Sequence, residues 1–170
     1  MGSRGVKNEF GFSTLEVLLT VVVIGIMSAL SIKPLSSLLQ KIKLQNAADG
    51  MKHFILTARL RAVSNTERHC GVVFRFHPSV TVNDTVFAFL DASPPDNNYT
   101  KGKDSLYLRP FILYKRDKIA SVIPAGYPTV IVFRGDGSAT LSAKVVLTLK
   151  TRQDTVTVLA STGKVKAVLK

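Results

Sequence analysis

The sequence is poor in the residues that carry most metal and nucleophilic chemistry. Its 170 residues include one cysteine, Cys70, three histidines and no tryptophan. A single cysteine cannot form a disulfide within the chain or a cysteine-based zinc site. We interpret Cys70 as a buried structural thiol, with His69 and His77 as exposed imidazoles. The phrases HExxH and GxSxG and a glycine-rich phosphate loop are also missing. We therefore predict no enzyme, no metal and no cofactor.

Acidic residues are scarce as well. The 11 Asp and Glu stand against 23 Lys and Arg, which gives a formal net charge of +12. Such an excess favours an acidic partner, whether nucleic acid, anionic lipid or protein, but does not choose among them. The 46% hydrophobic content and nine phenylalanines exclude a largely disordered chain. The length fits one domain of ordinary size.

The hydrophobic residues are concentrated in one run near the N-terminus. Residues 12–32 are 21 positions whose only charge is Glu16. As a helix at ~1.5 Å per residue this run is about 30 Å long, which matches a bilayer core. A cleaved secretory signal and a buried core helix are the alternatives. The run is longer than a signal-peptide core, and the rest of the chain is too small to surround so apolar a helix. We predict a transmembrane segment.

The residues at the start of this run explain its single charge. Ser13 to Glu16 forms a capping box, which is sufficient for a soluble helix. At the edge of hydrocarbon, however, a carboxylate needs a cation. Cleavage after Gly11 would create an amine at Phe12, one helical turn from Glu16 on the same chain or on a parallel neighbour.

Gly11, Phe12, Glu16 and the aliphatic helix that follows resemble the type IV prepilin signature. The resemblance implies that residues 1–11 are a leader, which a prepilin peptidase removes between Gly11 and Phe12. It also implies N-methylation of Phe12, and pairing of Glu16 with the terminal amine of an adjacent pilin subunit. Pro34 lies near the bend of many pilin helices, one residue later than is usual.

The same resemblance predicts where the protein resides. It implies a single-pass protein of the bacterial inner membrane, in contact with its lipid before assembly, with the N-terminus cytoplasmic and the C-terminal domain periplasmic. The positive-inside rule predicts the opposite orientation. It weighs Arg4, Lys7 and Glu9 before the run against Lys33, Lys41 and Lys43 after it. We follow the motif, because the peptidase must reach Gly11 from the cytoplasm.

The remainder of the chain changes from helical to strand periodicity. Apolar residues at steps of three and four predict an amphipathic helix over residues 33–65. Residues 66–170 form the predicted globular β domain, in which β-branched and aromatic runs alternate with turn residues. The fold class is α+β, a long helix packed on an antiparallel sheet or sandwich. The expected strands are 70–76, 85–90, 105–114, 118–123, 129–133, 144–149, 155–159 and 164–169.

Three short phrases resemble the GspH/FimT group of minor pilins and pseudopilins. They are Ala58-Arg59 with Arg61-Ala62, residues 132–137 (VFRGDG), and residues 161–165 (STGKV). The group implies a subunit near a filament tip whose β domain contacts other minor subunits or secreted protein substrates. A type IV pilus and a type II secretion pseudopilus both remain open.

Two polar segments are candidate binding sites. Alternation in the last strand places Lys164, Lys166 and Lys170 on one face, and the phrase resembles a basic C-terminal motif with which relatives bind DNA during natural transformation. The alternative interpretation is a lysine-lined edge strand that discourages aggregation. The acids of residues 91–104 suggest calcium, but their spacing matches no known loop, so a solvated turn is predicted. A structural filament subunit is the leading hypothesis, and a DNA-binding minor pilin is the alternative.

Overall fold

The computed structural model describes residues 12–65, 68–77, 82–92, 94–113, 117–123 and 129–169; the side chains of residues 30–34, 117, 123 and 169 are not among those described. The chain divides into two units, Met1–Leu39 and Gln40–Lys170. One α-helix, α1 (Thr14–Ser64), contributes to both units. The carbonyl of Ser13 accepts the first helical hydrogen bonds, from the N–H groups of Glu16 and Val17.

The predicted transmembrane segment at residues 12–32 is corrected by the structure. Among the residues that the structure describes, no helix is long and apolar enough to cross a membrane. The predicted inner-membrane location, with a cytoplasmic N-terminus and a periplasmic domain, is corrected with it.

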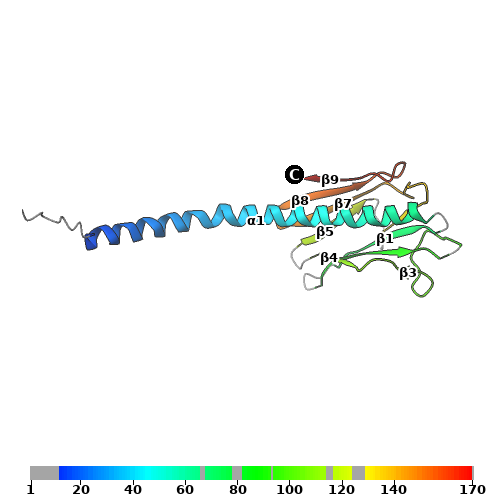
Figure 1. Cartoon of the computed structure of the whole chain (residues 1–170), viewed down its shortest axis with the longest axis horizontal. Helices are drawn as coiled ribbons and strands as arrows, with labels where there is room; N and C mark the ends of the chain where they lie inside the picture. The colour runs from blue at the N-terminus through cyan, green and yellow to red at the C-terminus, as the bar shows by residue number, and fades with distance from the viewer. Residues whose placement is uncertain are drawn as a thin grey trace, which may run out of the picture. The chain divides into compact units, whose positions relative to one another are not determined.

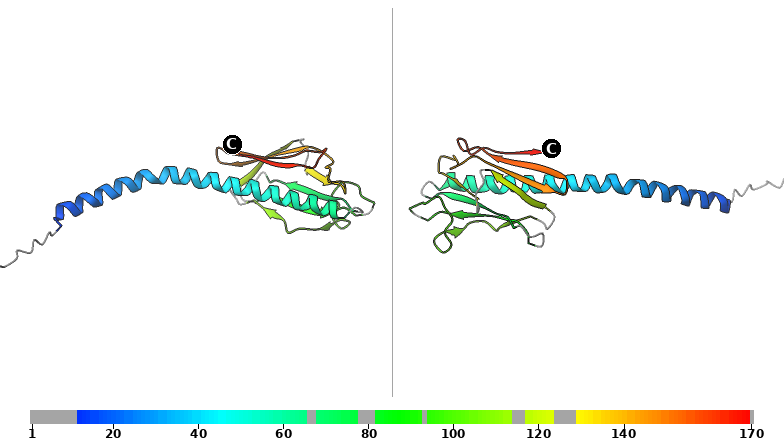
Figure 2. Two further views of the ribbon diagram at one scale, coloured as in Figure 1. Left: turned by 45° about the horizontal axis from the view of Figure 1, so that its top comes forward. Right: turned by 180° about the vertical axis from the view of Figure 1, so that it is seen from behind.

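The second unit is an α+β domain with two antiparallel sheets (Figures 1 and 2). The first sheet has the order β3-β2-β1-β6, and β4 also pairs with β2. Its strands are β1 (Cys70–Arg75), β2 (Thr85–Leu90), β3 (Ser105–Leu106), β4 (Phe111–Ile112) and β6 (Thr129–Phe133). The second sheet has the order β5-β7-β8-β9. Its strands are β5 (Asp117–Ile123), β7 (Ala143–Leu149), β8 (Arg152–Val158) and β9 (Val165–Leu169).

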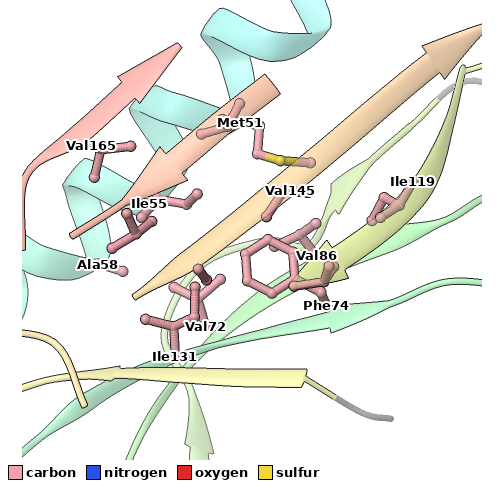
Figure 3. Packing of buried hydrophobic residues seen from close by; sticks show 14 of the residues in the cluster. Met51, Ile55, Ala58, Val72, Phe74, Val86, Ile119, Ile131, Val145 and Val165 are labelled. Atoms are coloured by element: carbon pink, nitrogen blue, oxygen red, sulfur yellow. The ribbon is translucent and has the colours of Figure 1, made fainter. Parts of the chain in front are cut away.

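The apolar stripe of the helix forms one side of the core. The residues predicted to face the sheet from position 44 onward are all at most 1% exposed: Leu44, Ala48, Met51, Ile55, Ala58 and Ala62. They pack with the inner residues of both sheets, such as Val72, Phe74 and Val145 (Figure 3). The predicted amphipathic helix is confirmed over this part of the chain.

The apolar residues earlier in the predicted amphipathic stretch are not buried. Leu35, Leu38, Leu39 and Ile42 are between 42% and 57% exposed. The buried stripe therefore begins at Leu44, the first helix residue in the described core cluster.

A single strand at residues 105–114 was expected, and the structure replaces it with two strands of two residues each. Leu106 pairs with Phe89, and Phe111 pairs with Val86, so both short strands lie along β2. Four residues separate Leu106 from Phe111, whereas only two separate their partners on β2. Pro110 falls within this interruption, and proline has no N–H for a ladder hydrogen bond.

The outer face of the first sheet carries a second, smaller apolar cluster. Val73, Phe87, Phe89 and Val132 are at most 6% exposed. Tyr99 covers them from the loop after β2, with its ring centroid 4.9 Å from that of Phe87 in an edge-on arrangement. The loop is thus held to the sheet by aromatic contacts.

Candidate assembly and binding surfaces

The predicted processing and assembly residues lie at the start of the helix. Gly11 is outside the described residues, so the structure does not place the cleavage position. Phe12 is 80% exposed. Glu16 is exposed in the first helical turn, and within the described residues its carboxylate has no ion-pair partner.

Residues 14–29 of α1, in the first unit, are exposed on all sides. Val21, Val22, Val23 and Ile24 follow one another and are between 47% and 63% exposed. Consecutive helical positions differ by about 100°, so these four side chains point in four different directions. In all, eleven large apolar residues between positions 12 and 27 are at least 47% exposed. A surface of this size marks an interaction site, and a single partner helix could cover only one stripe of it.

The basic C-terminal segment has the predicted alternation. Lys164 precedes β9 and Lys166 lies within it, and both are exposed, whereas Val165 between them is 7% exposed. Lys170 is outside the described residues. Among the strands that the structure describes, β9 pairs with β8 alone, so it is an edge strand, as the alternative interpretation of the lysines requires.

The tertiary structure adds Lys144 to this surface. Thr157 of β8 pairs with Lys166 on one side and with Lys144 of β7 on the other. Directly paired residues of antiparallel strands share a face with Cβ atoms about 4.5–5.5 Å apart, so the two lysines flank Thr157 in a row. Asp154 is on the opposite face and 2% exposed. No described side chain on the outer face of this sheet is acidic.

Lys144 was not identified from the sequence. Strand alternation alone already predicts that Lys144 lies on the other face of the strand from its neighbours Ala143 and Val145. What was missing was the register of three strands, which the local pattern does not contain.

The three family-like phrases meet at one place in the structure, around Arg59. Its Nε donates a hydrogen bond to the carbonyl of Gly137 (3.0 Å), and its Nη2 donates to the carbonyl of Thr162 (2.9 Å). Gly137 belongs to the turn after β6, and Thr162 to the turn between β8 and β9. Arg59 thus ties the helix to a turn of each sheet, which gives these phrases a structural role.

Arg61 has a different environment from Arg59. Its guanidinium lies over the ring of Tyr107, 4.9 Å from the centroid. This cation–π contact joins the helix to the residue that follows β3.

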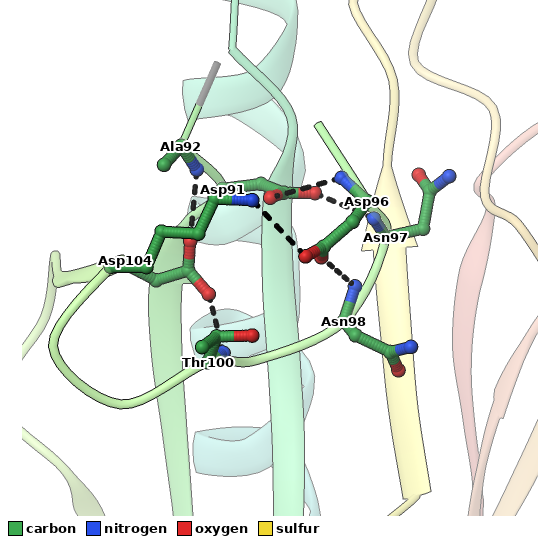
Figure 4. A network of polar contacts seen from close by, with 8 residues as sticks. Asp91, Ala92, Asp96, Asn97, Asn98, Thr100 and Asp104 are labelled. Carbon is green, nitrogen blue, oxygen red and sulfur yellow. Dashed lines mark hydrogen bonds and ion pairs between the residues drawn. The ribbon is translucent and has the colours of Figure 1, made fainter. Parts of the chain in front are cut away.

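The loop at residues 91–104 uses its carboxylates internally (Figure 4). Asp91 is fully buried and accepts hydrogen bonds from the N–H groups of Asp96 and Asn97. Asp104 accepts from the N–H groups of Ala92 and Thr100. These bonds explain a buried carboxylate without a metal, since each oxygen is satisfied by backbone donors.

Asp96 is the exposed member of this group. The hydrogen bond from the N–H of Asn98, and then that from Lys103, lower the pKa of its carboxyl below the usual value. Within the described residues, no group of three or more potential ligands could hold a metal ion. The prediction of a solvated turn is too simple, because Asp91 anchors the loop from inside.

Cys70 is buried, as predicted, and burial raises the pKa of its thiol to about 12. The thiol is therefore protonated and unreactive at neutral pH. His69 and His77 were expected to be exposed, but both are half-buried. The Nδ1 of His69 lies 3.1 Å from Oδ1 of Asn97, which joins His69 to the 91–104 loop.

Comparison with known proteins does not identify a family for this chain. No protein-family model matches the chain, and no match was found among curated proteins or solved structures.

Proposed function

We propose that this chain is a structural subunit of a pilus-like filament, a minor pilin or pseudopilin, and is not an enzyme. In this proposal a prepilin peptidase removes residues 1–11, and the new N-terminus at Phe12 is methylated. The helix of the first unit then packs among the corresponding helices of other pilin subunits. The β domain contacts neighbouring minor subunits or secreted protein substrates.

The observation that carries the proposal is the apolar surface on all sides of residues 12–27. Association through it removes apolar area from water at about 25 cal/mol per Å². Because the surface surrounds the helix, several neighbours are needed to cover it, as the interior of a filament provides. Glu16 is the one charge in this surface, and it is exposed and without an ion-pair partner among the described residues. The terminal amine of an adjacent subunit would neutralise it.

Replacing Glu16 with alanine is expected to reduce incorporation into filaments more than about tenfold while cleavage continues. The physical reason is that the amine of the neighbour would be left without its counterion in an apolar environment, at a cost of about 3–5 kcal/mol. Incorporation is measured by immunoblotting sheared filament fractions from the native host. Mass spectrometry of the incorporated wild-type chain should show a methylated N-terminus at Phe12.

The matched control is Asp49→Ala, which removes an exposed acid on the same helix outside the first unit. It should leave incorporation unchanged. Normal incorporation of Glu16→Ala would disprove the pairing, and a filament chain that retains residues 1–11 would disprove the processing.

A second candidate function, DNA binding during natural transformation, is favoured by one observation. Lys164, Lys166 and Lys144 lie on one sheet face that has no acidic side chain among those described. Each lysine that contacts a phosphate contributes by releasing condensed counterions.

If this face binds DNA, replacing Lys144, Lys164 and Lys166 together with alanine should abolish a gel shift that weakens steeply with salt. The wild-type titration is run at two salt concentrations. Lys52→Ala, a helix lysine outside this face, is the control. No shift by the wild-type chain at low salt would reject DNA binding.

A further inference from the structure

The two sheets have four edges, and three of them are protected from pairing with another strand. At one edge of the first sheet, β3 and β4 have two residues each. At the other edge, the end of β6 is covered, because the N–H of Thr140 donates to the carbonyl of Val132 and its Oγ1 accepts from the Val132 N–H. In the second sheet, β5 has a register shift between Ile119 and Ser121. Short strands, covering segments and bulges are the usual devices that prevent edge pairing.

The fourth edge, β9, has none of these devices. It is a regular strand of five residues that pairs with β8 without a register shift. The N–H of Leu159 donates to the carbonyl of Lys164, so this pair is a hydrogen-bonded one. Such pairs alternate along an antiparallel ladder, which turns the backbone N–H and C=O groups of Val165 and Ala167 away from β8. No described residue pairs with this side of β9.

The side chains of β9 determine which strand could pair there. Lys166 and Val168 are exposed on the outer face, next to Lys164. A second copy of β9 would place lysines against lysines, which is destabilising in directly opposed positions. A strand with acidic residues at alternate positions would instead place a carboxylate beside each lysine. The lysines thus prevent self-pairing and select an acidic partner.

We propose that β9 is a docking strand for an extended acidic segment of a partner protein, which adds to the second sheet as a fifth strand. Backbone hydrogen bonds to Val165 and Ala167 supply the affinity, and Lys164 and Lys166 supply the selectivity for acidic side chains. The inference goes beyond the filament role, because it requires neither cleavage at Gly11 nor contacts of the apolar helix.

The test uses the full-length chain in mild detergent and a synthetic peptide of alternating Glu and Val, about ten residues long. Binding is measured by fluorescence anisotropy of the labelled peptide. Ala167→Pro removes an outward N–H without removing a β8–β9 hydrogen bond, so it should weaken binding by about tenfold or more. Lys144→Ala, which removes a charge two strands away from the edge, should change binding less than about twofold. A peptide of alternating Lys and Val should not bind.

Hydrogen exchange keeps the test decisive if Ala167→Pro fails to fold. In the wild-type chain, the amides of Val165 and Ala167 should gain protection when the Glu-Val peptide binds. Absence of binding, binding that survives Ala167→Pro in the folded variant, or binding without this protection would overturn the proposal. Duplex DNA that displaces the peptide equally well from the wild type and from the Ala167→Pro variant would also overturn it, since the lysines would then act as a phosphate-binding face.

Discussion

Replacing Gly163 with alanine is expected to lower the free energy of unfolding by about 2–5 kcal/mol. Gly163 has a φ of +57°, in the left-handed region, where a side chain costs roughly 1–2 kcal/mol. A Cβ at this position would also collide with the carbonyl oxygen of Gly137, a backbone atom. Relieving such overpacking costs typically about 1–3 kcal/mol more, and here it separates the two turns that Arg59 joins.

The matched control is Gly102→Ala. Gly102 also has a positive φ, +92°, but a Cβ there would meet nothing within 4 Å. Its substitution therefore measures backbone strain without the collision. Urea unfolding of the full-length chain, followed by far-ultraviolet circular dichroism, compares the two variants. Equal losses would show that the contact between the turns contributes nothing.

Replacing Asp84 with alanine is expected to have an effect of similar size, a loss of about 3–5 kcal/mol. Asp84 is 1% exposed, and its carboxylate accepts hydrogen bonds from the N–H groups of His77 and Ile119, both at 2.8 Å. The Nζ of Lys118 is a third donor, at 3.4 Å. Alanine would leave the two backbone donors unsatisfied, at about 1–3 kcal/mol each, and remove an ion pair that is largely out of solvent.

Asp84→Asn should lose less stability than Asp84→Ala, because the amide oxygen can still accept from one of the N–H groups. Asp136→Ala is the control. The Asp136 carboxylate is exposed and is hydrogen-bonded to Ser138 of its own turn, so the loss from its removal should be much smaller. The bond from Ile119 of β5 to Asp84, which precedes β2, joins the two sheets. If Asp84→Ala and Asp136→Ala unfold at the same urea concentration, this connection contributes no stability.

Much of the fold was predictable because it depends on local periodicity. The predicted strands at residues 85–90 and 129–133 have the observed bounds. The helical stripe from Leu44 to Ala62 is buried at every predicted position. The dipeptide Asp136-Gly137 is typical of a turn, and Gly137 has the positive φ that such a turn requires. In each case the side-chain pattern repeats with the period of the element itself.

Other features could not be predicted because they depend on segments far apart in the chain. Arg59 contacts the carbonyls of Gly137 and Thr162, which are 78 and 103 residues away. The burial of Asp84 and Asp91 follows from donors on other segments, whereas carboxylates in polar stretches are usually solvated. The transmembrane prediction relied on the length and apolar character of residues 12–32, and it is corrected because no helix among the described residues is long and apolar enough to cross a membrane.

The sequence by itself determined the α+β class, the apolar stripe of the helix, most strands and the alternation of lysines in the last strand, because these follow from the period of helix and strand. Only the tertiary structure decided that β9 is a regular edge, that Lys144 joins Lys166 across Thr157, and that the family-like phrases meet at Arg59. The strand register and the position of each strand in its sheet depend on how distant segments pair. So do contacts between residues about a hundred positions apart, such as Arg59 and Thr162. No local sequence pattern contains that information.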